Sequence, residues 1–367
     1  MDNQIKRKII LEDGSEFSGY SFGSGSEKLL ELVFNTSMAG YQEILSDPSY
    51  TGQAVVMTYP VVGNYGINKD DFETKVPSIG AMIVREYTPI PSNFRSEKTL
   101  SDFMKEYDIA GVYGIDTRKL TMKIRDYGSC KVLITDGDVT KEEGLKKLSS
   151  FEYPVDHVSH VSTKKPWTTD NINDTSCLHV AAIDCGIKLN IVRELVAHGC
   201  RVTVLPYDSK PEDIDALKPD GIFLSNGPGD PADVKETIEL VKNLKGRYPI
   251  FGICLGHQIL SLAYGAATYK LKFGHRGGNH PVKDLTTGLI DITSQNHSYA
   301  VDEKSLEGTG LKVSNINILD NTVEGVCHMS DPSFGIQYHP EACPGPCDSN
   351  HLFDRFVKMM RGESINA

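Results

Sequence analysis

A cysteine between two glycines is a potential nucleophile. Gly252, Cys254 and Gly256 follow an apolar run that begins at Pro249. Gly-x-Cys-x-Gly has the spacing of a nucleophile elbow, with a thiol in place of the usual hydroxyl. Glycine is needed at both flanking positions, because the backbone of the nucleophile is strained and side chains two residues away would collide. The spacing therefore predicts a sharp turn from strand to helix with Cys254 at its tip.

The helix expected after Cys254 would activate its thiol. Backbone N–H groups at a helix N-terminus carry partial positive charge, which favours the reactive thiolate. The N–H of Leu255 is placed to bind a developing oxyanion. A buried structural cysteine is the alternative, because that is the commonest state of a free cysteine. A catalytic role for Cys254 therefore needs support from other residues.

A histidine and a carboxylate near the C-terminus supply that support. An apolar strand is expected to end in His339, and Glu341 lies two residues further on. The period of two in a strand puts both side chains on the same side. A carboxylate beside an imidazole selects its tautomer and raises its basicity. Cys254, His339 and Glu341 are thus a candidate nucleophile, base and orienter, unless the histidine and glutamate only meet solvent.

Two other expected strand ends carry residues suited to binding. Residues 224–231 (LSNGPGDP) include Gly227 and Gly229, which let backbone N–H groups approach a ligand or an oxyanion closely. A bare turn explains this motif better when it is taken alone. Residues 294–299 (SQNHSY) carry amides that could bind the charged head of an α-amino acid. Both motifs indicate a binding site only if they lie close to Cys254 and His339.

A zinc site among the C-terminal residues is a competing interpretation. Four potential ligands are spaced four residues apart: His339, Cys343, Cys347 and His351. Such spacing suits metal ligands on a helix. Three prolines and a glycine lie between them, so no regular helix runs there. We therefore expect no metal in this chain.

The elements that must position these residues alternate between strand and helix from Leu178 onward. Apolar runs predict the strands, and apolar residues on one helical face predict the helices. Strands are expected at 179–184, 201–205, 221–225, 249–253, 291–295, 311–319, 323–328 and 334–338, and helices at 187–196, 234–244 and 352–360. The alternation predicts right-handed βαβ crossovers and a doubly wound, mainly parallel α/β sheet. In such sheets the chemistry gathers at the carboxyl ends of the strands.

The beginning of the chain, residues 1–150, predicts a separate α+β domain. Its expected elements are strands at 32–34, 54–59 and 79–84 and a helix at 99–107. Residues 151–176 are polar and include Pro154, which indicates a linker. The α/β domain then comprises residues 177–367, and the junction is expected near residue 175.

The composition is that of a globular protein with about two domains. The chain has 367 residues, of which 39% are apolar and 24% charged, which excludes a disordered polyelectrolyte. Its net charge of −11 argues against a general nucleic-acid binder, which needs clustered positive charge. Eight cysteines are too sparse for a disulfide scaffold, so we expect free thiols in a reducing cytoplasm.

Neither a targeting segment nor a membrane segment is expected. The N-terminus, MDNQIKRK, has no apolar stretch after its charges, unlike a signal peptide. Residues 249–269 contain no Asp, Glu, Lys or Arg over 21 positions, which is long enough to span a bilayer. Several glycines, His257, Gln258 and a leading proline favour a buried strand, turn and helix instead.

Together these motifs resemble a class I glutamine amidotransferase domain, in which an elbow cysteine precedes a C-terminal His-x-Glu pair. Other segments resemble the small-subunit family of carbamoyl-phosphate synthases. These segments are residues 34–43 (FNTSMAGYQE), 47–50 (DPSY), 59–66 (YPVVGNYG), 114–121 (GIDTRKLT) and 272–281 (KFGHRGGNHP). The resemblance extends along nearly the whole chain.

The resemblance implies a glutaminase mechanism. Cys254 would attack the side-chain amide of glutamine, and His339 would relay protons as ammonia leaves. Backbone N–H groups of Gly229 and Leu255 would hold the oxyanion, and water would then cleave the γ-glutamyl thioester. The glutamine-binding positions that the family implies are Ser49, Gly227, Gly229, Leu255, Gln258, Asn296, Ser298 and Tyr299.

The resemblance also implies a partner, a large synthetase subunit in a heterodimer or a higher assembly of heterodimers. Ammonia would pass through an internal tunnel to this subunit, which uses ATP, Mg and bicarbonate to make carbamoyl phosphate for pyrimidine or arginine synthesis. The chain itself has no Gly-x4-Gly-Lys-Ser/Thr loop and no Gly-x-Gly-x-x-Gly motif, so we expect no cofactor in it. Neither nucleic acid nor a membrane is an expected partner.

Some positions depart from the family's pattern. Many relatives carry glycine where this chain has Ser298, so a backbone contact there requires a φ that serine can adopt. Residues 127–131 (YGSCK) are shorter than the family's usual run, and Cys343 and Cys347 stand where relatives often carry Ser and His. The competing functions are a stand-alone γ-glutamyl hydrolase, the amidotransferase of another synthase, and a catalytically silent assembly subunit.

Overall fold

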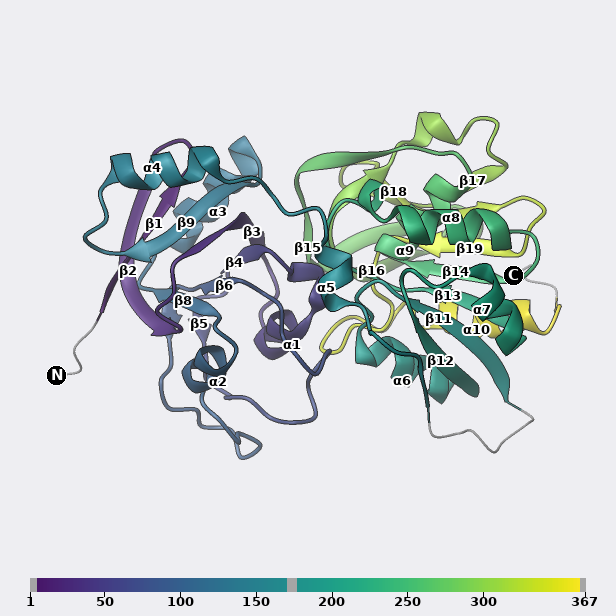
Figure 1. Ribbon diagram of the computed structural model, residues 1–367, viewed down its shortest axis with the longest axis horizontal. Coiled ribbons are helices and arrows are strands. Elements are labelled where there is room, and N and C mark those ends of the chain that lie inside the picture. The colour runs from purple at the N-terminus through teal and green to yellow at the C-terminus, as the bar shows by residue number, and fades with distance from the viewer. Residues whose placement is uncertain (1–4, 170–176, 364–367) are drawn as a thin grey trace. The chain divides into compact units, whose positions relative to one another are not determined.

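The computed structural model describes residues 5–169 and 177–363 (Figure 1). It divides into two compact units, Met1–Pro154 and Val155–Ala367. Part of the segment predicted as a linker carries regular structure in the second unit, namely α5 (His157–Val161) and β10 (Trp167–Thr168). Residue 175, the expected junction, lies outside the described residues.

The first unit is built on a closed β-barrel. Its strands follow the order β1-β2-β8-β6-β4-β3-β9 around the barrel. Their bounds are β1 Lys6–Leu11, β2 Glu16–Gly23, β3 Lys28–Asn35, β4 Gln53–Met57, β6 Ala81–Ile83, β8 Ala110–Tyr113 and β9 Cys130–Asp136. The pairs β3–β4, β4–β6 and β6–β8 are parallel, and the other pairs are antiparallel. Closure leaves no open edge strand in the barrel.

Short helices complete the first unit. They are α1 (Tyr41–Ser46), η1 (Pro48–Tyr50), α2 (Leu100–Glu106), α3 (Thr117–Tyr127) and α4 (Lys141–Ser150), and a small sheet pairs β5 (Val61–Val62) with β7 (Glu86–Tyr87). Helix α2 begins after Thr99, whose side-chain oxygen accepts the N–H of Asp102 as an N-cap. The predicted helix at 99–107 and the α+β character of this unit are confirmed.

The second unit contains a ten-stranded sheet in the order β10-β12-β11-β13-β14-β19-β18-β16-β15-β17. The remaining bounds are β11 Leu178–Asp184, β12 Cys200–Pro206, β13 Gly221–Leu224, β14 Ile250–Ile253, β15 Thr268–Asp284, β16 Ile290–Val301, β17 Leu311–Asn317, β18 Val323–His328 and β19 Ser333–Ile336. Strands β12, β11, β13, β14 and β19 are parallel, and the other strands pair antiparallel. The predicted parallel arrangement holds for these central strands, and the whole sheet is mixed.

Helices cover both faces of the parallel strands. Val180 and Ala182 of β11 face one core, and Ala181 and Ile183 face the other, because successive side chains alternate along a strand. The first core is completed by α6 (Leu189–Ala197) and α10 (His351–Met360), and the second by α7 (Pro211–Leu217), α8 (Lys235–Leu244) and α9 (Leu255–Ala263). This is the doubly wound α/β arrangement that the alternating elements predict (Figure 1).

The uncharged run at 249–269 lies inside the second unit. It forms β14, the turn at Cys254, helix α9 and the first residues of β15. Most of its apolar side chains belong to the buried cores, whereas Tyr269 at its end is exposed. The run is therefore the predicted strand, turn and helix of a folded domain. Within residues 5–169 and 177–363, no helix has both the length and the apolar character that crossing a bilayer requires.

Candidate active site

Cys254 occupies the strained turn between β14 and α9. Its backbone has φ 54° and ψ −105°, a left-handed φ that is uncommon for a residue with a side chain. The N–H of Cys254 donates to the carbonyl of Ile336 on β19, 2.8 Å away, which anchors the turn to the sheet. Strain of this kind gathers at functional sites, because the surrounding packing must hold it in place. The predicted elbow is therefore present.

The two flanking glycines are required by close backbone contacts. A Cβ added at Gly252 would lie 2.6 Å from the carbonyl of Gly256, and one added at Gly256 would lie 2.1 Å from the carbonyl oxygen of Leu224. Neither neighbour can move aside, because both are backbone atoms of packed elements. The glycines thus let the helix pass close to the sheet at the turn.

We expect Gly256→Ala to destabilise the second unit by at least about 3 kcal/mol, since it forces backbone atoms apart in a packed core. The measurement is the midpoint of urea unfolding. Gly278→Ala is the matched control, because its added Cβ would meet only the Cδ of Pro346, at an ordinary 3.7 Å. Equal midpoints for the two variants would contradict the close-packing account.

His339 and Glu341 form a buried hydrogen-bonded pair. Nδ1 of His339 lies 2.7 Å from Oε1 of Glu341, and each residue is 2% exposed. Nδ1 must carry a proton, because a carboxylate only accepts, so in the neutral form of the ring Nε2 keeps its lone pair. No described residue gives Nε2 a hydrogen-bond partner. This is the tautomer that a general base needs.

The strand that carries this pair is shorter than predicted. The prediction that a strand ends in His339 is wrong, because β19 ends at Ile336. The N–H of Gln337 still donates to Glu324 of β18, but that of His339 donates to Ser294 of β16, 2.9 Å away. The change of partner bends the chain. The pairing of His339 with Glu341 therefore arises in a turn and not from the alternation of a strand.

The thiol and the imidazole interact electrostatically. Burial and the Lys188 cation lower the pKa of His339, but Glu341 and Cys254 raise it more, and the result is about 9. Burial raises the pKa of Glu341, but His339 and Lys188 lower it further, to about 2. An ionised carboxylate beside an imidazole of raised basicity is the arrangement that accepts a thiol proton.

Lys188 is a site residue that sequence reasoning missed. Its side chain is 9% exposed, and Nζ lies 3.2 Å from Oε1 of Glu341 and 3.2 Å from Nδ1 of His339. The positive charge keeps the buried Glu341 carboxylate ionised. The predicted helix at 187–196 included Lys188, whereas α6 begins at Leu189 and Lys188 lies between it and β11. A lysine shortly after a predicted strand was the available signal, because such strand ends gather chemistry.

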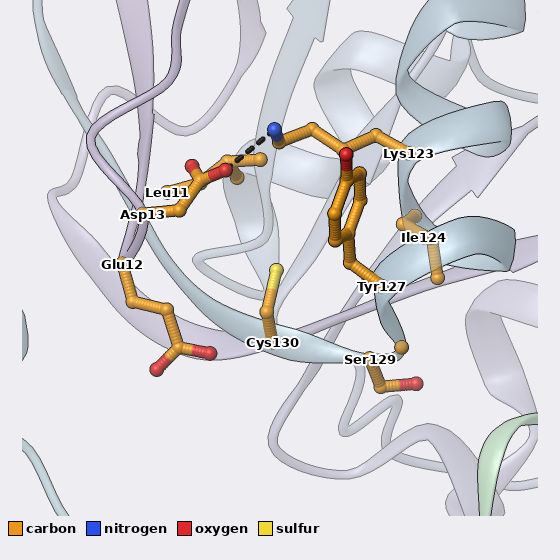
Figure 2. A pocket seen from close by; sticks show the side chains of 9 residues that line it. Leu11, Glu12, Asp13, Lys123, Ile124, Tyr127, Ser129 and Cys130 are labelled. Carbon is orange, nitrogen blue, oxygen red and sulfur yellow. Dashed lines mark ion pairs between the residues drawn. The ribbon is translucent and has the colours of Figure 1, made fainter.

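Other thiols of the chain are less suited than Cys254 to act as a nucleophile. Burial raises the pKa of Cys130, Cys185 and Cys200 to about 12 in each case, which keeps them protonated near neutral pH. Residues 127–130, which include Cys130, line a small pocket of the first unit beside Lys123 (Figure 2). Nζ of Lys123 is paired there with the carboxylate of Asp13 at 2.5 Å.

Two predicted binding segments of the second unit lie beside the elbow. Gly227 follows β13 and is packed so closely that an added Cβ would lie 2.2 Å from the carbonyl oxygen of Cys185 and 2.7 Å from the side chain of Leu255. Gly229, two residues on, has φ 86°, which only glycine adopts freely. Leu255 is the first residue of α9, where backbone N–H groups have no acceptor within the helix.

The segment 294–299 reaches the same place from β16. The thiol of Cys254 lies 3.6 Å from the carbonyl oxygen of Asn296 and donates to it. The amide of Gln258 donates to the carbonyl of Tyr299 at 2.7 Å and to Oε1 of Gln337 at 2.8 Å. These contacts join the elbow to residues 294–299, which lie inside β16 (Ile290–Val301) and not at a strand end as predicted.

Ser298 and Ser49 complete the predicted glutamine-binding positions. Among the residues that the structure describes, Ser298 is not one of the non-glycine residues with positive φ, so its backbone is of a kind that serine adopts readily. Its hydroxyl accepts a hydrogen bond from Arg276. Ser49 lies in η1 of the first unit, where its N–H donates to the side chain of Asp47. Its part in binding remains a prediction.

The four residues considered as zinc ligands do not form a cluster. Nδ1 of His339 is engaged by Glu341, and the side chains of Cys343 and Cys347 are exposed. In the described part of the chain, the group of His, Cys, Asp and Glu side chains close enough to hold an ion consists of His275, His297 and Glu324. That group does not include His339 or Glu341.

Comparisons with known proteins agree with this geometry. Residues 181–359 match the family model of class I glutamine amidotransferases, and residues 9–134 match that of the carbamoyl-phosphate synthase small chain, CPSase domain. The carbamoyl phosphate synthase small chain of Staphylococcus saprophyticus is 54% identical to this chain, over 97% of this chain and 96% of the relative. That of Bacillus caldolyticus is 53% identical over 99% of this chain and 100% of the relative.

Proposed function

The chain belongs to the family of carbamoyl phosphate synthase small chains, and we propose that it hydrolyses glutamine and delivers the ammonia to a large synthetase subunit. The observation that carries the proposal is the buried pair of His339 and Glu341 beside a cysteine on a strained elbow. Family membership supports the large subunit as the partner that consumes the ammonia. That partner would also supply the sites for ATP, Mg and bicarbonate.

The proposed reaction begins with the attack of the Cys254 sulfur on the side-chain amide carbon of glutamine. His339 accepts the thiol proton at Nε2, and the carbonyl oxygen becomes an oxyanion. The N–H groups of Leu255 and Gly229 are proposed to hold that oxyanion. The C–N bond then breaks, the imidazolium gives its proton to the leaving nitrogen, and ammonia departs. A γ-glutamyl thioester remains on the sulfur.

The second half of the reaction regenerates the thiol. A water molecule gives a proton to His339 and attacks the thioester carbon. The C–S bond breaks, the imidazolium returns a proton to the sulfur, and glutamate leaves. Glu341 and Lys188 act through His339 by holding its ring and its charge. The glutamine head group is proposed to lie against Ser49, Gln258, Asn296, Ser298 and Tyr299.

A glutamine analogue with an electrophilic group at the γ-position tests the site directly. We expect it to modify Cys254 with a stoichiometry of about one, because that thiol alone combines an elbow with an adjacent base. Peptide mapping locates the label, and excess glutamine should protect against it. The exposed thiols of Cys343 and Cys347 are the internal controls. Labelling of these controls without glutamine protection would contradict the assignment.

Co-purification distinguishes the partner-bound enzyme from the competing functions. The proposal expects a large ATP-binding subunit to co-elute with this chain and the complex to make carbamoyl phosphate from glutamine. A stand-alone γ-glutamyl hydrolase would elute without such a partner. A silent assembly subunit would co-elute but fail to react with the electrophilic analogue.

A further inference from the structure

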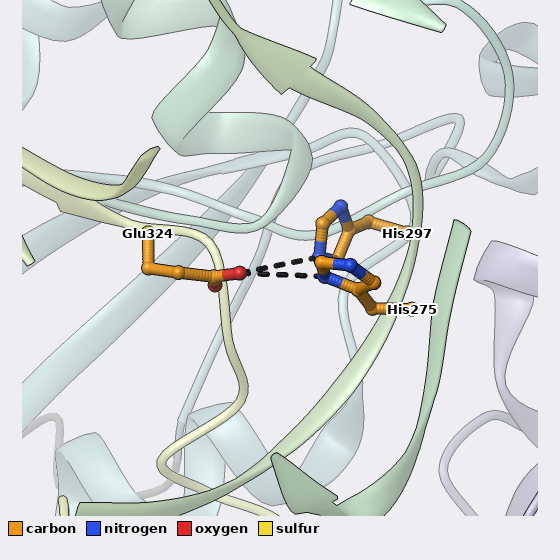
Figure 3. Close-up of side chains that lie close together, drawn as sticks. All are labelled: His275, His297 and Glu324. Carbon is orange, nitrogen blue, oxygen red and sulfur yellow. Dashed lines mark ion pairs between the residues drawn. The ribbon is translucent and has the colours of Figure 1, made fainter. Parts of the chain in front are cut away.

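A second cluster of buried ionisable side chains lies in the antiparallel part of the second unit. His275 of β15 and His297 of β16 are direct register partners, and Glu324 reaches them from β18 (Figure 3). Their side chains are 10%, 1% and 0% exposed. Nothing in the proposed glutamine chemistry uses His275 or Glu324.

The outer nitrogen of each imidazole is committed to an acceptor. Nε2 of His275 lies 2.8 Å from a carboxylate oxygen of Asp320, and Nδ1 of His297 lies 2.8 Å from the carbonyl oxygen of Tyr299. A carboxylate and a carbonyl only accept, so each outer nitrogen carries a proton. The lone pairs of the two neutral rings are therefore on the inner nitrogens, Nδ1 of His275 and Nε2 of His297.

The inner nitrogens point at further acceptors. Oε1 of Glu324 lies 3.4 Å from Nδ1 of His275 and 3.9 Å from Nε2 of His297. Nε2 of His297 also lies 3.2 Å from Oε1 of Gln295, and Nδ1 of His275 has no hydrogen-bond partner among the described residues. Several lone pairs thus converge on one buried place, which is costly unless a cation lies between them.

Turning the Gln295 amide does not remove the unfavourable contact between acceptors. Its Nε2 now donates to Oε2 of Glu324 at 3.0 Å. A rotation that offered the amide N–H to His297 would place the amide oxygen against that carboxylate oxygen instead. Either orientation leaves two acceptors face to face while Glu324 is ionised. A rotation of the amide alone therefore does not satisfy the cluster.

We propose that His275, His297 and Glu324 form a binding site for one divalent transition-metal ion of the zinc class. The ligand atoms lie within 4.8 Å of one another. Bonds of about 2.0–2.1 Å from a tetrahedral centre separate its ligands by about 3.3 Å, so only small side-chain movements are needed. Two imidazoles and a carboxylate suit zinc, whereas Mg²⁺ and Ca²⁺ prefer oxygen ligands alone.

The surroundings of the cluster are those of a metal site. Histidine ligands usually donate their outer N–H to a carboxylate or a backbone carbonyl, as His275 does to Asp320 and His297 to Tyr299. The Asp320 side chain, which contacts His275, is 42% exposed, so the cluster lies close to the surface of the second unit. Oε1 of Gln295 or a water molecule would fill the fourth position.

A proton is the competing cation. Burial lowers the pKa of His275, but Asp320 and Glu324 raise it more, to about 9. Burial also raises the pKa of Glu324. A proton on that carboxyl would hydrogen-bond to a turned Gln295 amide, so a proton and a metal ion are competing occupants of the cluster, and zinc titration distinguishes them. Because metal and proton compete for the same lone pair, metal affinity should increase as the pH rises toward 9. The site goes beyond the proposed glutaminase function and does not depend on it.

The test is calorimetric titration of the full chain with ZnCl₂ after removal of metals by a chelator. We expect one bound equivalent in the unaltered protein and affinity that increases between pH 6.5 and pH 8.5. Glu324→Gln keeps the size of the ligand and should weaken binding by more than about 100-fold, since changes to outer partners alone typically cost roughly 10–100-fold. Asp320→Asn, at the exposed rim, should weaken binding by roughly 10–100-fold.

His328→Gln is the matched control, because His328 lies on the same strand as Glu324 but packs against Tyr264. It should bind zinc like the unaltered protein. Far-UV circular dichroism checks the fold of each variant, and Asp320→Asn serves if Glu324→Gln does not fold. Co²⁺ as a probe should give visible bands without a thiolate charge-transfer band. No stoichiometric binding, equal affinity in the folded variants, or a thiolate band would overturn the proposal.

Discussion

Replacing Cys254 with serine is expected to abolish glutamine-dependent carbamoyl phosphate synthesis and to spare synthesis from added ammonia. The loss should be at least about 10⁴-fold, the order found when a nucleophile that acts together with its base is removed. The hydroxyl of serine is a far weaker nucleophile than a thiolate, and His339 is the only base described next to it. Both rates are measured on the complex with the large subunit, with glutamine or with an ammonium salt.

The comparison of the two nitrogen sources makes this experiment decisive. Ammonia bypasses the proposed thioester, so a variant that assembles correctly must keep the ammonia-dependent rate. Cys343→Ser is the control, because Cys343 is an exposed thiol that the proposed reaction does not use. Loss of both activities in a complex that still co-elutes on gel filtration would be incompatible with the assignment of Cys254.

The elbow could be predicted from the sequence because its pattern, a cysteine between two glycines, lies within one short segment. The glycines at 252 and 256 are dictated by contacts of their own backbone with a neighbouring turn and strand. The parallel strands were predictable for the same reason, since each is a short apolar run between turn residues. A single segment of sequence is enough to recognise either pattern, although the contact that requires Gly256 is with Leu224 of β13.

Features that depend on distant pairing could not be predicted. The barrel order of the first unit requires β1 to pair with β9, with Arg7 opposite Asp136, and no local pattern records that pairing. Lys188 meets His339 across 151 positions of the chain. The group of His275, His297 and Glu324 is assembled by three strands, so its members look unrelated in the sequence. Local reasoning names such residues only after the sheet order is known.

The candidate site combines a feature of one short segment with features that depend on distant strand pairing. The elbow supplies a strained cysteine from local sequence, while the mixed sheet brings its base from a turn near the other end of the chain. His339 lies next to Cys254 because β19 is the parallel neighbour of β14, with Ile336 opposite Ile253. The bend after Ile336 then turns His339 toward the elbow. The pair of strands therefore matters as much to the reaction as the residues themselves.

Removing the base is expected to have the second large effect. His339→Asn should lower glutamine hydrolysis by at least about 10³-fold, and Glu341→Gln by somewhat less, because the orienter acts only through the base. The double variant should be about as slow as His339→Asn alone, since the two residues act as one unit. Steady-state rates of glutamate release measure all three.

The pH dependence separates an orienting role of Glu341 from a structural one. Glu341 raises the pKa of His339, so Glu341→Gln should lower that pKa. A base of lower pKa stays neutral to lower pH, so the acidic limb of kcat/KM should shift toward lower pH. Glu194→Gln is the matched control, because Glu194 also neighbours a histidine, His198, but lies on α6. A Glu341→Gln variant with an unchanged rate and an unshifted acidic limb would exclude the proposed pair, since a carboxylate 2.7 Å from the base must influence its charge.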